Sequence, residues 1–230
     1  MNLSERDDQL RELMDDPDCD PARLHATLRR FGIINRLVSG WETVYRTRLR
    51  PVLTEFDRPA RVLDLGSGGG DVITRLARLA ARDGLEVHWT GVDPDPRAHS
   101  AAISRQGHGI TFLQADTDAL LEKGDDFDVV ISNHVLHHLD DAELLDFTSA
   151  SRTLASTAVF HGDIARSRLA YGLFAVGILP LSPGTFLRTD GLRSIRRSYR
   201  REELSAALGP EWEVSSPAPF RLIAEGAGRA

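Results

Sequence analysis

A glycine-rich turn is the feature that most constrains how this chain can fold. Residues 62–71 read VLDLGSGGGD, so an apolar strand runs directly into glycines and then into a stretch with helical patterning. Glycine has no Cβ and tolerates positive φ, which lets a ligand approach the backbone closely. The turn therefore predicts a ligand-binding loop of an α/β fold. A glycine-rich turn without a ligand is the alternative.

Short apolar runs alternate with helical stretches from residue 61 onward. The expected strands are 61–65, 86–92, 111–114, 128–132 and 157–161, and the expected helices are 69–83, 96–105, 117–123 and 141–154. Such alternation indicates a Rossmann-like parallel sheet with helices on both faces. Two terminal β-like runs, 213–216 and 220–224, are separated by prolines.

The chain divides into four expected parts. Residues 4–50 have helical spacing, with Ser4 and Asp20 as candidate N-caps. The parts are a helical lid at 1–55, a cofactor-binding core at 56–165, a substrate cap at 166–205, and closing strands of the core at 206–230.

Charge separates the two cofactor classes that use such a loop. A dinucleotide fingerprint G-x-G-x-x-G starting at Gly66 would need its third glycine at Asp71, and carboxylates at 64 and 71 would repel a pyrophosphate. The same residues fit Asp64-x-Gly66-x-Gly68-x-Gly70. A carboxylate at the strand end suits a cation, so the loop favours the amino group and sulfonium of S-adenosylmethionine.

Carboxylates also follow the next two expected strands. Asp93 lies 25 positions after Gly68, where its carboxylate can accept both ribose hydroxyls. Asp116 can accept from an adenine amino group or cap the following helix. The candidate cofactor-binding residues are Asp64, Gly66, Ser67, Gly68, Gly70, Asp93, Pro94, Asp116, Thr117 and Asn133.

These elements, in order and spacing, resemble the class I S-adenosylmethionine-dependent methyltransferase family over residues 60–165. The resemblance implies a seven-stranded sheet with an antiparallel last strand. It also implies that Asp64, Gly66, Gly68, Asp93 and Asp116 line the cofactor. The run LHHL at 136–139 is common in small-molecule members.

A weaker resemblance lies upstream of the glycine loop. Residues 35–41, followed by Tyr45 and Arg46, are similar to the helical lead-in of ubiquinone and menaquinone biosynthesis C-methyltransferases, whose N-terminal helices fold over the cofactor. The chain lacks the arginine-asparagine signature of that subgroup after the fourth strand. The acceptor atom, oxygen, carbon or nitrogen, therefore stays open.

Histidines after the fourth strand are the candidate catalytic bases. Methyl transfer is an in-line displacement that depends on alignment, and a phenolic or carbon acceptor must also lose a proton. We expect His134 as the base and His138 as the second choice, with packing or capping as their alternative roles. No acidic or cysteine partner lies at a recognised spacing, so no metal is expected.

The segment after the fifth strand is the expected substrate region. The candidate substrate-binding residues are Tyr45, His161, Asp163, Tyr171 and Phe174. An arginine-rich helix follows in this segment, carrying Arg188, Arg193, Arg196, Arg197, Arg200 and Arg201. It predicts either a solvated face or capture of an anionic substrate, carrier protein or membrane surface.

Composition excludes several classes. The net charge of −6 argues against a nucleic-acid partner, and no signal peptide or membrane-spanning run is recognisable, which predicts a cytoplasmic location. We expect a small-molecule methyltransferase of secondary metabolism, monomeric or homodimeric, acting on a phenol, quinone precursor or polyketide. A nicotinamide-dependent oxidoreductase and an inactive S-adenosylmethionine-binding regulator are the alternatives.

Overall fold

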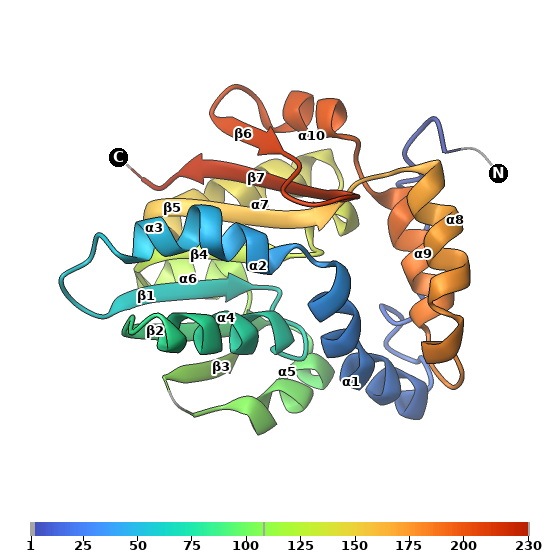
Figure 1. Ribbon diagram of the computed structural model, residues 1–230, viewed down its shortest axis with the longest axis horizontal. Coiled ribbons are helices and arrows are strands. Elements are labelled where there is room, and N and C mark those ends of the chain that lie inside the picture. The colour runs from blue at the N-terminus through green and yellow to red at the C-terminus, as the bar shows by residue number, and fades with distance from the viewer. Residues whose placement is uncertain (1–2, 108, 230) are drawn as a thin grey trace.

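The computed structural model describes residues 3–107 and 109–229, and one seven-stranded sheet organises them (Figure 1). The strand order is β3-β2-β1-β4-β5-β7-β6. The strands are β1 Ala60–Leu65, β2 Val87–Asp93, β3 Ile110–Gln114, β4 Phe127–Asn133, β5 Ala155–Ile164, β6 Trp212–Ser215 and β7 Arg221–Ala227. Strands β1 to β5 pair in parallel, and β7 is antiparallel to β5 and β6. The predicted sheet, with its antiparallel last strand, is confirmed.

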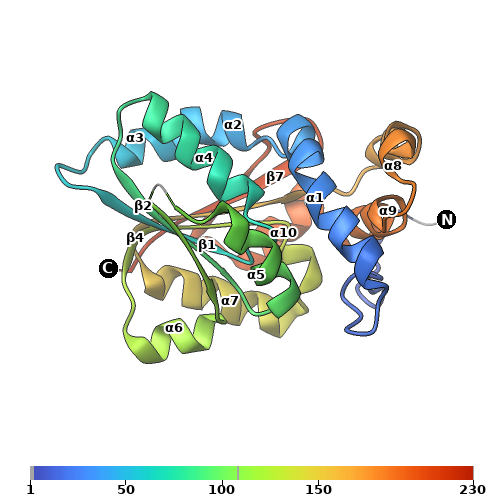
Figure 2. The ribbon, with the colours of Figure 1, turned by 90° about the horizontal axis from the view of Figure 1, so that it is seen from below.

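Helices cover both faces of the sheet (Figure 2). They are α1 Pro21–Val38, α2 Trp41–Val44, α3 Arg50–Leu53, α4 Asp71–Arg82, α5 Pro96–Ala102, α6 Thr117–Lys123, α7 Asp141–Leu154, α8 Arg168–Gly177, α9 Leu187–Arg197 and α10 Arg201–Leu208. A π-helical turn at Tyr45–Leu49 joins α2 to α3. The core is therefore split by the sheet. Trp41, Leu49 and Leu76 pack with one face, and Leu144 and Leu204 pack with the other.

The N-terminal segment departs from the sequence prediction. Residues 3–20 form turns and bends, and the first helix begins at Pro21, so the helix expected from Ser4 was wrong. Asp20 is the N-cap as predicted, since its Oδ1 accepts from the amides of Ala22 and Arg23. The reason is tertiary: the amides of Leu13 and Met14 donate to the Asp190 carboxylate of α9 rather than to helical carbonyls.

The carboxyl ends of β1, β4 and β5 point toward α1, α8 and α9 (Figure 1). The N-terminal segment runs beside α9, where the Asp7 amide donates to the Arg196 carbonyl at 3.1 Å. This edge of the sheet is where ligands bind in open α/β folds. Among the described residues, none of the helices has both the length and the apolar character needed to cross a bilayer.

Candidate active site

The glycine loop after β1 has the backbone that its sequence predicted. Gly66, Gly68 and Gly70 have φ values of 69°, 53° and 75°, in the left-handed region. A Cβ on Gly66 would lie 2.6 Å from Val135 Cγ2, and one on Gly70 would lie 2.4 Å from Phe112 Cζ. A Cβ on Gly68 would meet no described atom within 4 Å. Packing therefore accounts for the outer two glycines, whereas Gly68 borders open space.

Two buried polar groups beside this loop lack a partner among the described residues. They are Asp64 Oδ1 and Ser67 Oγ. Asp64 is only 1% exposed. Burial raises the pKa of Asp64 well above its ordinary value, and the charges of Asp71 and Asp93 raise it further. Orphaned buried polar atoms are rare in folded proteins. A cationic ligand donating hydrogen bonds would satisfy this carboxylate, so the residues present fit the cofactor predicted from the sequence.

Asp93 ties the end of β2 to the glycine loop. Its Oδ2 accepts from the Gly68 amide and its Oδ1 from the Asp95 amide, both at 2.9 Å. Burial raises the pKa of Asp93, and these two amides oppose that rise. A carboxylate has about four acceptor sites, so capacity remains for ligand hydroxyls. Pro94 follows as an exposed residue.

Asp116 caps a helix, which was one of its two predicted roles. Its Oδ1 accepts from the Ala119 amide at 2.9 Å, and Thr117 is the first residue of α6. The side chain belongs to an exposed residue after β3. Contact with an adenine amino group stays a prediction.

The end of β4 is held by two residues that the sequence analysis did not place in the site. Asn133 Oδ1 accepts from Trp41 Nε1 at 2.9 Å and from Arg221 Nη2 at 3.1 Å. Arg221 Nη2 also lies 2.8 Å from His134 Nε2, and its Nε donates to the Ser39 carbonyl. Arg221 is buried, which lowers its pKa to about 10, still well within the charged range at neutral pH.

His134 has a strained backbone and a nitrogen that is already engaged. Its φ is 64°, a value that non-glycine residues rarely adopt and that concentrates at functional sites. Arginine can only donate, so His134 Nε2 is the acceptor and Nδ1 carries the proton. Burial, and then the Arg221 charge, lower the pKa of His134 well below its ordinary value. In this geometry His134 is neutral, and its Nε2 can accept a proton only after Arg221 moves away.

His137 and Asp163 form a buried charged pair behind His134. His137 Nδ1 lies 2.7 Å from Asp163 Oδ1, and the His137 amide donates to Asp163 Oδ2. Burial alone would lower the pKa of His137, but Asp163 and Glu12 raise it to about 9. Burial alone would raise the pKa of Asp163, but the His137 charge lowers it. Asp163 is thus occupied within the protein rather than free for substrate.

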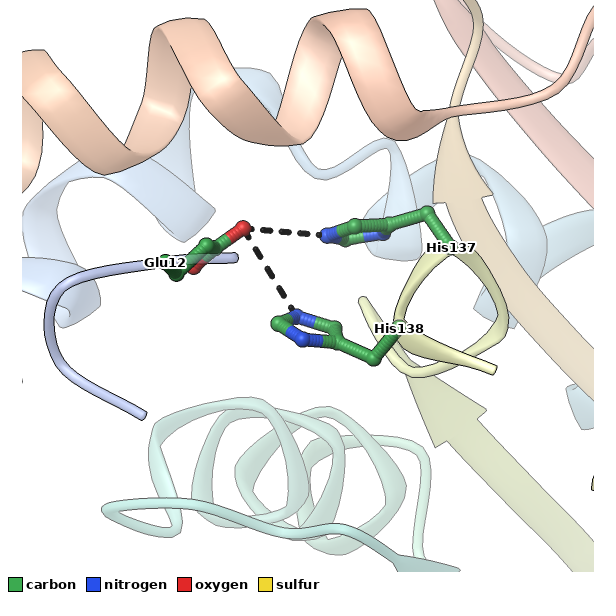
Figure 3. A group of neighbouring side chains, drawn as sticks. All are labelled: Glu12, His137 and His138. Atoms are coloured by element: carbon green, nitrogen blue, oxygen red, sulfur yellow. Dashed lines mark hydrogen bonds and ion pairs between the residues drawn. The ribbon is translucent and has the colours of Figure 1, made fainter. Parts of the chain in front are cut away.

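Glu12 joins this pair from the N-terminal segment (Figure 3). Its Oε1 lies 3.4 Å from His137 Nε2 and 3.7 Å from His138 Nε2. Burial would raise the pKa of Glu12, but His138 and His137 lower it to about 2. The sequence analysis found no acidic partner at a recognised spacing, and Glu12 lies 125 positions from His137 along the chain, where no spacing could indicate it.

Two of the predicted substrate-binding side chains, those of Tyr45 and His161, are engaged in packing. The Tyr45 hydroxyl donates to Asp83 Oδ2 at 2.9 Å, just after α4 ends, and the residue is 1% exposed. His161 Nδ1 lies 2.8 Å from Ser132 Oγ, and its ring is near Phe147 and Trp212 on the opposite face of the sheet from Tyr45. Both side chains pack in the core of the ligand-free protein, and contact of Tyr45 or His161 with a substrate stays a prediction.

The α8 residues have different surroundings. The Phe174 ring lies so close to Gly191 of α9 that a Cβ there would be 2.4 Å from its Cζ, so Phe174 joins the two helices of the expected cap. Tyr171 is half-buried. Neither contact tests substrate binding, which stays a prediction for both residues.

The arginine cluster is mixed in its exposure: Arg188, Arg200 and Arg201 are exposed, and the other three are partly or fully buried. Arg197 is buried, and it donates to the carbonyls of His137 and His138 at 3.1 and 2.9 Å. Arg193 donates to the Arg11 carbonyl and Arg196 to the Asp7 carboxylate. The remaining members bond carbonyls of the same chain: Arg188 to Ala175, Arg200 to Leu3 and Arg201 to Val214. Four members, Arg193, Arg196, Arg197 and Arg200, thus hold the N-terminal segment or the turn after β4.

Sequence reasoning missed Glu12, Trp41 and Arg221 as residues of this region. Trp41 had a signal, because it closes the apolar face of 24–41 directly before the lead-in motif. Arg221 and Glu12 had none. Arg221 meets its neighbours because β7 returns beside β5, and Glu12 meets its neighbours because of the path that residues 3–20 follow.

Comparison with known proteins supports the fold and the glycine loop. A methyltransferase-domain family model matches residues 62–156. A protein named ubiquinone biosynthesis O-methyltransferase from Brucella anthropi is 31% identical over 152 residues, which cover 64% of this chain and 57% of that protein. Its namesake from Brucella melitensis is 30% identical over 167 residues, covering 71% and 60%. The matched part of the chain thus spans less than two-thirds of these relatives.

Solved structures extend the similarity to nearly the whole chain. The plantazolicin methyltransferase BpumL, in complex with SAH, matches with a TM-score of 0.64 at 14% identity, covering 94% of this chain and 93% of that one. The CurJ carbon methyltransferase matches with a TM-score of 0.64 at 15% identity, covering 93% and 62%. By sequence over residues 62–156 the chain is similar to a methyltransferase-domain family, and over nearly all of its length it has the fold of these solved methyltransferases.

Proposed function

We propose that this chain transfers a methyl group from S-adenosylmethionine to a hydrophobic small molecule. The observation that carries the proposal is the pair of orphaned buried atoms, Asp64 Oδ1 and Ser67 Oγ, beside a loop of three left-handed glycines. An unpaired buried carboxylate is costly unless a ligand supplies its partner. An anionic dinucleotide phosphate would add charge of the wrong sign there, so the loop supports a cation.

The cofactor-binding roles follow from the placement of the loop residues. Asp64 would accept from the amino group of the cofactor, and Gly68 leaves space for close approach to the backbone. Asp93 would accept the ribose hydroxyls while holding the Gly68 amide. The other members of the proposed set are Gly66, Ser67, Gly70, Pro94, Asp116, Thr117 and Asn133.

The chemistry needs alignment more than reactive side chains. S-adenosylmethionine, when bound, supplies an electrophilic methyl group on a sulfonium. The protein must then hold the acceptor in line and exclude water. Asn133 is fixed by Trp41 and Arg221 at the end of β4, which gives this edge the rigidity that alignment requires.

The acceptor is proposed to be a hydroxyl of a phenol, quinone precursor or polyketide. The curated relatives are named ubiquinone biosynthesis O-methyltransferases, which favours oxygen over carbon.

The proposal also divides the chain into an N-terminal lid at 1–55, a core at 56–165, a cap at 166–205 and closing strands at 206–230. Exposed Leu169, Leu173 and Val176 on α8 give the cap apolar surface for such a substrate.

His134 is proposed to contact the acceptor as a neutral hydrogen-bonding group, with base catalysis as its second role. Its position directly after β4 supports contact, and its low pKa argues against strong basicity. His134→Ala should lower turnover about tenfold or more while cofactor affinity changes little. Calorimetry and steady-state turnover across a pH series check this. Full turnover at every pH would remove His134 from the reaction.

Calorimetric titration with S-adenosylmethionine tests the cofactor assignment. Asp93→Ala should weaken binding about 100-fold, since it removes charge-assisted hydrogen bonds to two hydroxyls. Asp118→Ala is the matched control, because Asp118 is an exposed carboxylate in the first turn of α6. Unchanged affinity in Asp93→Ala contradicts the ribose assignment. Binding of NADH in place of S-adenosylmethionine contradicts the whole proposal.

Turnover separates an enzyme from a cofactor-binding regulator. A panel of phenols and quinone precursors, followed by mass spectrometry, should yield a product heavier by one methyl group and S-adenosylhomocysteine in equal amount. Tight cofactor binding without product from any acceptor would favour the regulatory role instead.

A further inference from the structure

Three side chains from distant parts of the sequence converge at the turn after β4. Glu12 comes from the N-terminal segment, and His137 and His138 come from the turn (Figure 3). One ligand atom from each, Glu12 Oε1 and the two Nε2 atoms, lies within 4.8 Å of the others. Glu12 and His137 are buried, and His138 is partly buried. Two imidazoles and a carboxylate are a common ligand set for divalent transition metals.

The outer nitrogen of each imidazole is held by a carboxylate. His137 Nδ1 lies 2.7 Å from Asp163 Oδ1, and His138 Nδ1 lies 3.3 Å from Asp15 Oδ2. Such a carboxylate fixes the ring orientation and makes the opposite nitrogen the ligand. In both residues that opposite nitrogen is Nε2, which points toward Glu12 (Figure 3). The cluster therefore has the second layer of contacts that metal-binding histidines require.

The spacing also favours an ion between the side chains over direct pairing. A charge-assisted N–H···O bond is about 2.7–2.9 Å long, as His137 to Asp163 is. The 3.4 and 3.7 Å separations at Glu12 Oε1 are longer. Two ligands at about 2.0–2.1 Å from a tetrahedral zinc ion lie roughly 3.4 Å apart. The two separations from Glu12 Oε1 are thus close to those that such an ion would impose.

The backbone that carries the three residues is fixed from outside the cluster. Arg197 bonds the carbonyls of His137 and His138, and Ser194 Oγ donates to Glu12 Oε1. The amides of Leu13 and Met14 bond the Asp190 carboxylate. Because these contacts come from α9, little rearrangement is needed to bring the ligand atoms onto an ion.

We propose that Glu12, His137 and His138 bind one divalent transition metal ion of the zinc class, with at least one coordination position left for water. The ion fastens the N-terminal segment to the turn that follows Asn133 and His134, whose ring lies 6.0 Å from that of His137. This site is separate from the glycine loop and does not depend on the proposed methyl transfer.

Titration with Co²⁺ and then Zn²⁺ tests the site in the full-length protein, freed of any affinity tag and stripped with EDTA. Visible absorption should report one four-coordinate Co²⁺ per chain, displaced by one Zn²⁺, and zinc should raise Tm. Mass spectrometric metal analysis of the reloaded protein gives the stoichiometry. No stoichiometric metal and an unchanged Tm would overturn the proposal and leave a hydrogen-bonded cluster of the same residues.

Variants assign the ligands. Glu12→Gln and His138→Ala should each weaken Zn²⁺ binding at least 100-fold, and Asp15→Asn should weaken it about tenfold. His25→Ala is the matched control, because His25 is exposed on α1. Circular dichroism without metal checks that each variant is folded, and His138, with a side chain 29% exposed, is the safer ligand to remove. Wild-type affinity in the Glu12→Gln/His138→Ala double variant would overturn the site. S-adenosylmethionine binding measured in the same variants reports separately on the glycine loop.

Discussion

Two regions at the same edge of the sheet shift the pKa values of their carboxyl groups in opposite directions. The glycine-loop side, defined by Asp64, Asp71 and Asp93, raises the pKa of all three carboxyl groups, with burial as the largest cause. The histidine side, defined by Glu12, His137 and Asp163, lowers the pKa of its two carboxyl groups. The burial is similar in kind, so the difference lies in the partners.

The two regions differ in how far the chain itself satisfies their buried polar groups. On the histidine side, imidazoles of the same chain compensate the charges of the buried carboxylates. On the glycine-loop side, Asp64 Oδ1 and Ser67 Oγ have no partner among the described residues. The unsatisfied buried atoms on the glycine-loop side leave hydrogen-bonding capacity for a ligand. The histidine side satisfies its buried carboxylates within the chain, so it contributes to holding the fold even before the proposed metal ion binds.

The largest expected effect breaks the histidine side. Asp163→Asn removes the negative charge beside His137 and leaves the buried imidazolium with only the more distant Glu12 as a counter-charge, which should cost about 3–5 kcal/mol of unfolding free energy. Urea denaturation in EDTA measures this without any contribution from metal. Asp118→Asn, on an exposed carboxylate, is the control and should cost almost nothing. A loss below about 1 kcal/mol in Asp163→Asn would mean that the pair is not the anchor of this region.

The next effect has opposite signs for stability and binding. At a pH at which Asp64 is ionised, Asp64→Asn removes an unpaired buried charge while keeping the side-chain shape, so the ligand-free protein should gain about 1–3 kcal/mol of stability. Affinity for S-adenosylmethionine should fall tenfold or more, because the cation loses its counter-charge. Thermal unfolding and calorimetry measure the two effects. A variant that is less stable than the wild type would show that Asp64 already has a partner.

The smallest effect is a pH dependence of cofactor binding. The pKa of Asp64 is raised in the free protein, so below that value a cationic ligand must displace a proton. Affinity should therefore rise with pH, by at most about tenfold per unit, until Asp64 is ionised. Stability of the ligand-free protein should fall over the same window, since the folded state binds the extra proton. The neighbouring Asp71 and Asp93 have raised pKa values too, and Arg105 and Arg75 offset the shift at Asp71.

Calorimetry in buffers of different ionisation enthalpy counts the protons released at each pH. Asp64→Asn should flatten the dependence. An equal slope in that variant would assign the proton to another group.

The fold could be predicted almost completely from local patterns. Helix 117–123 and helix 141–154 have the predicted bounds, and each predicted strand overlaps its observed counterpart. These elements depend on periodicity and capping within a few residues of each other. The exception, residues 3–20, has no local helix because its amides and carbonyls find partners on α9.

The candidate site likewise contains residues that local spacing brings together and residues whose direction depends on packing. Asp64, the three glycines and Asp93 lie within one strand-loop-helix-strand unit, so spacing alone placed them together. The packing of Tyr45 and His161 in the core could not be predicted in advance, because a residue's direction from a helix or strand depends on what packs against it.

The sequence by itself determined the parallel sheet and the carboxylate-flanked glycine loop, since neighbouring residues specify both. Only the tertiary structure decided how the histidines are used. It brought Glu12 to His137 across 125 positions and Arg221 to His134 across 87. A buried charge takes whichever opposite charge the fold delivers, and that choice is made by packing rather than by spacing along the chain.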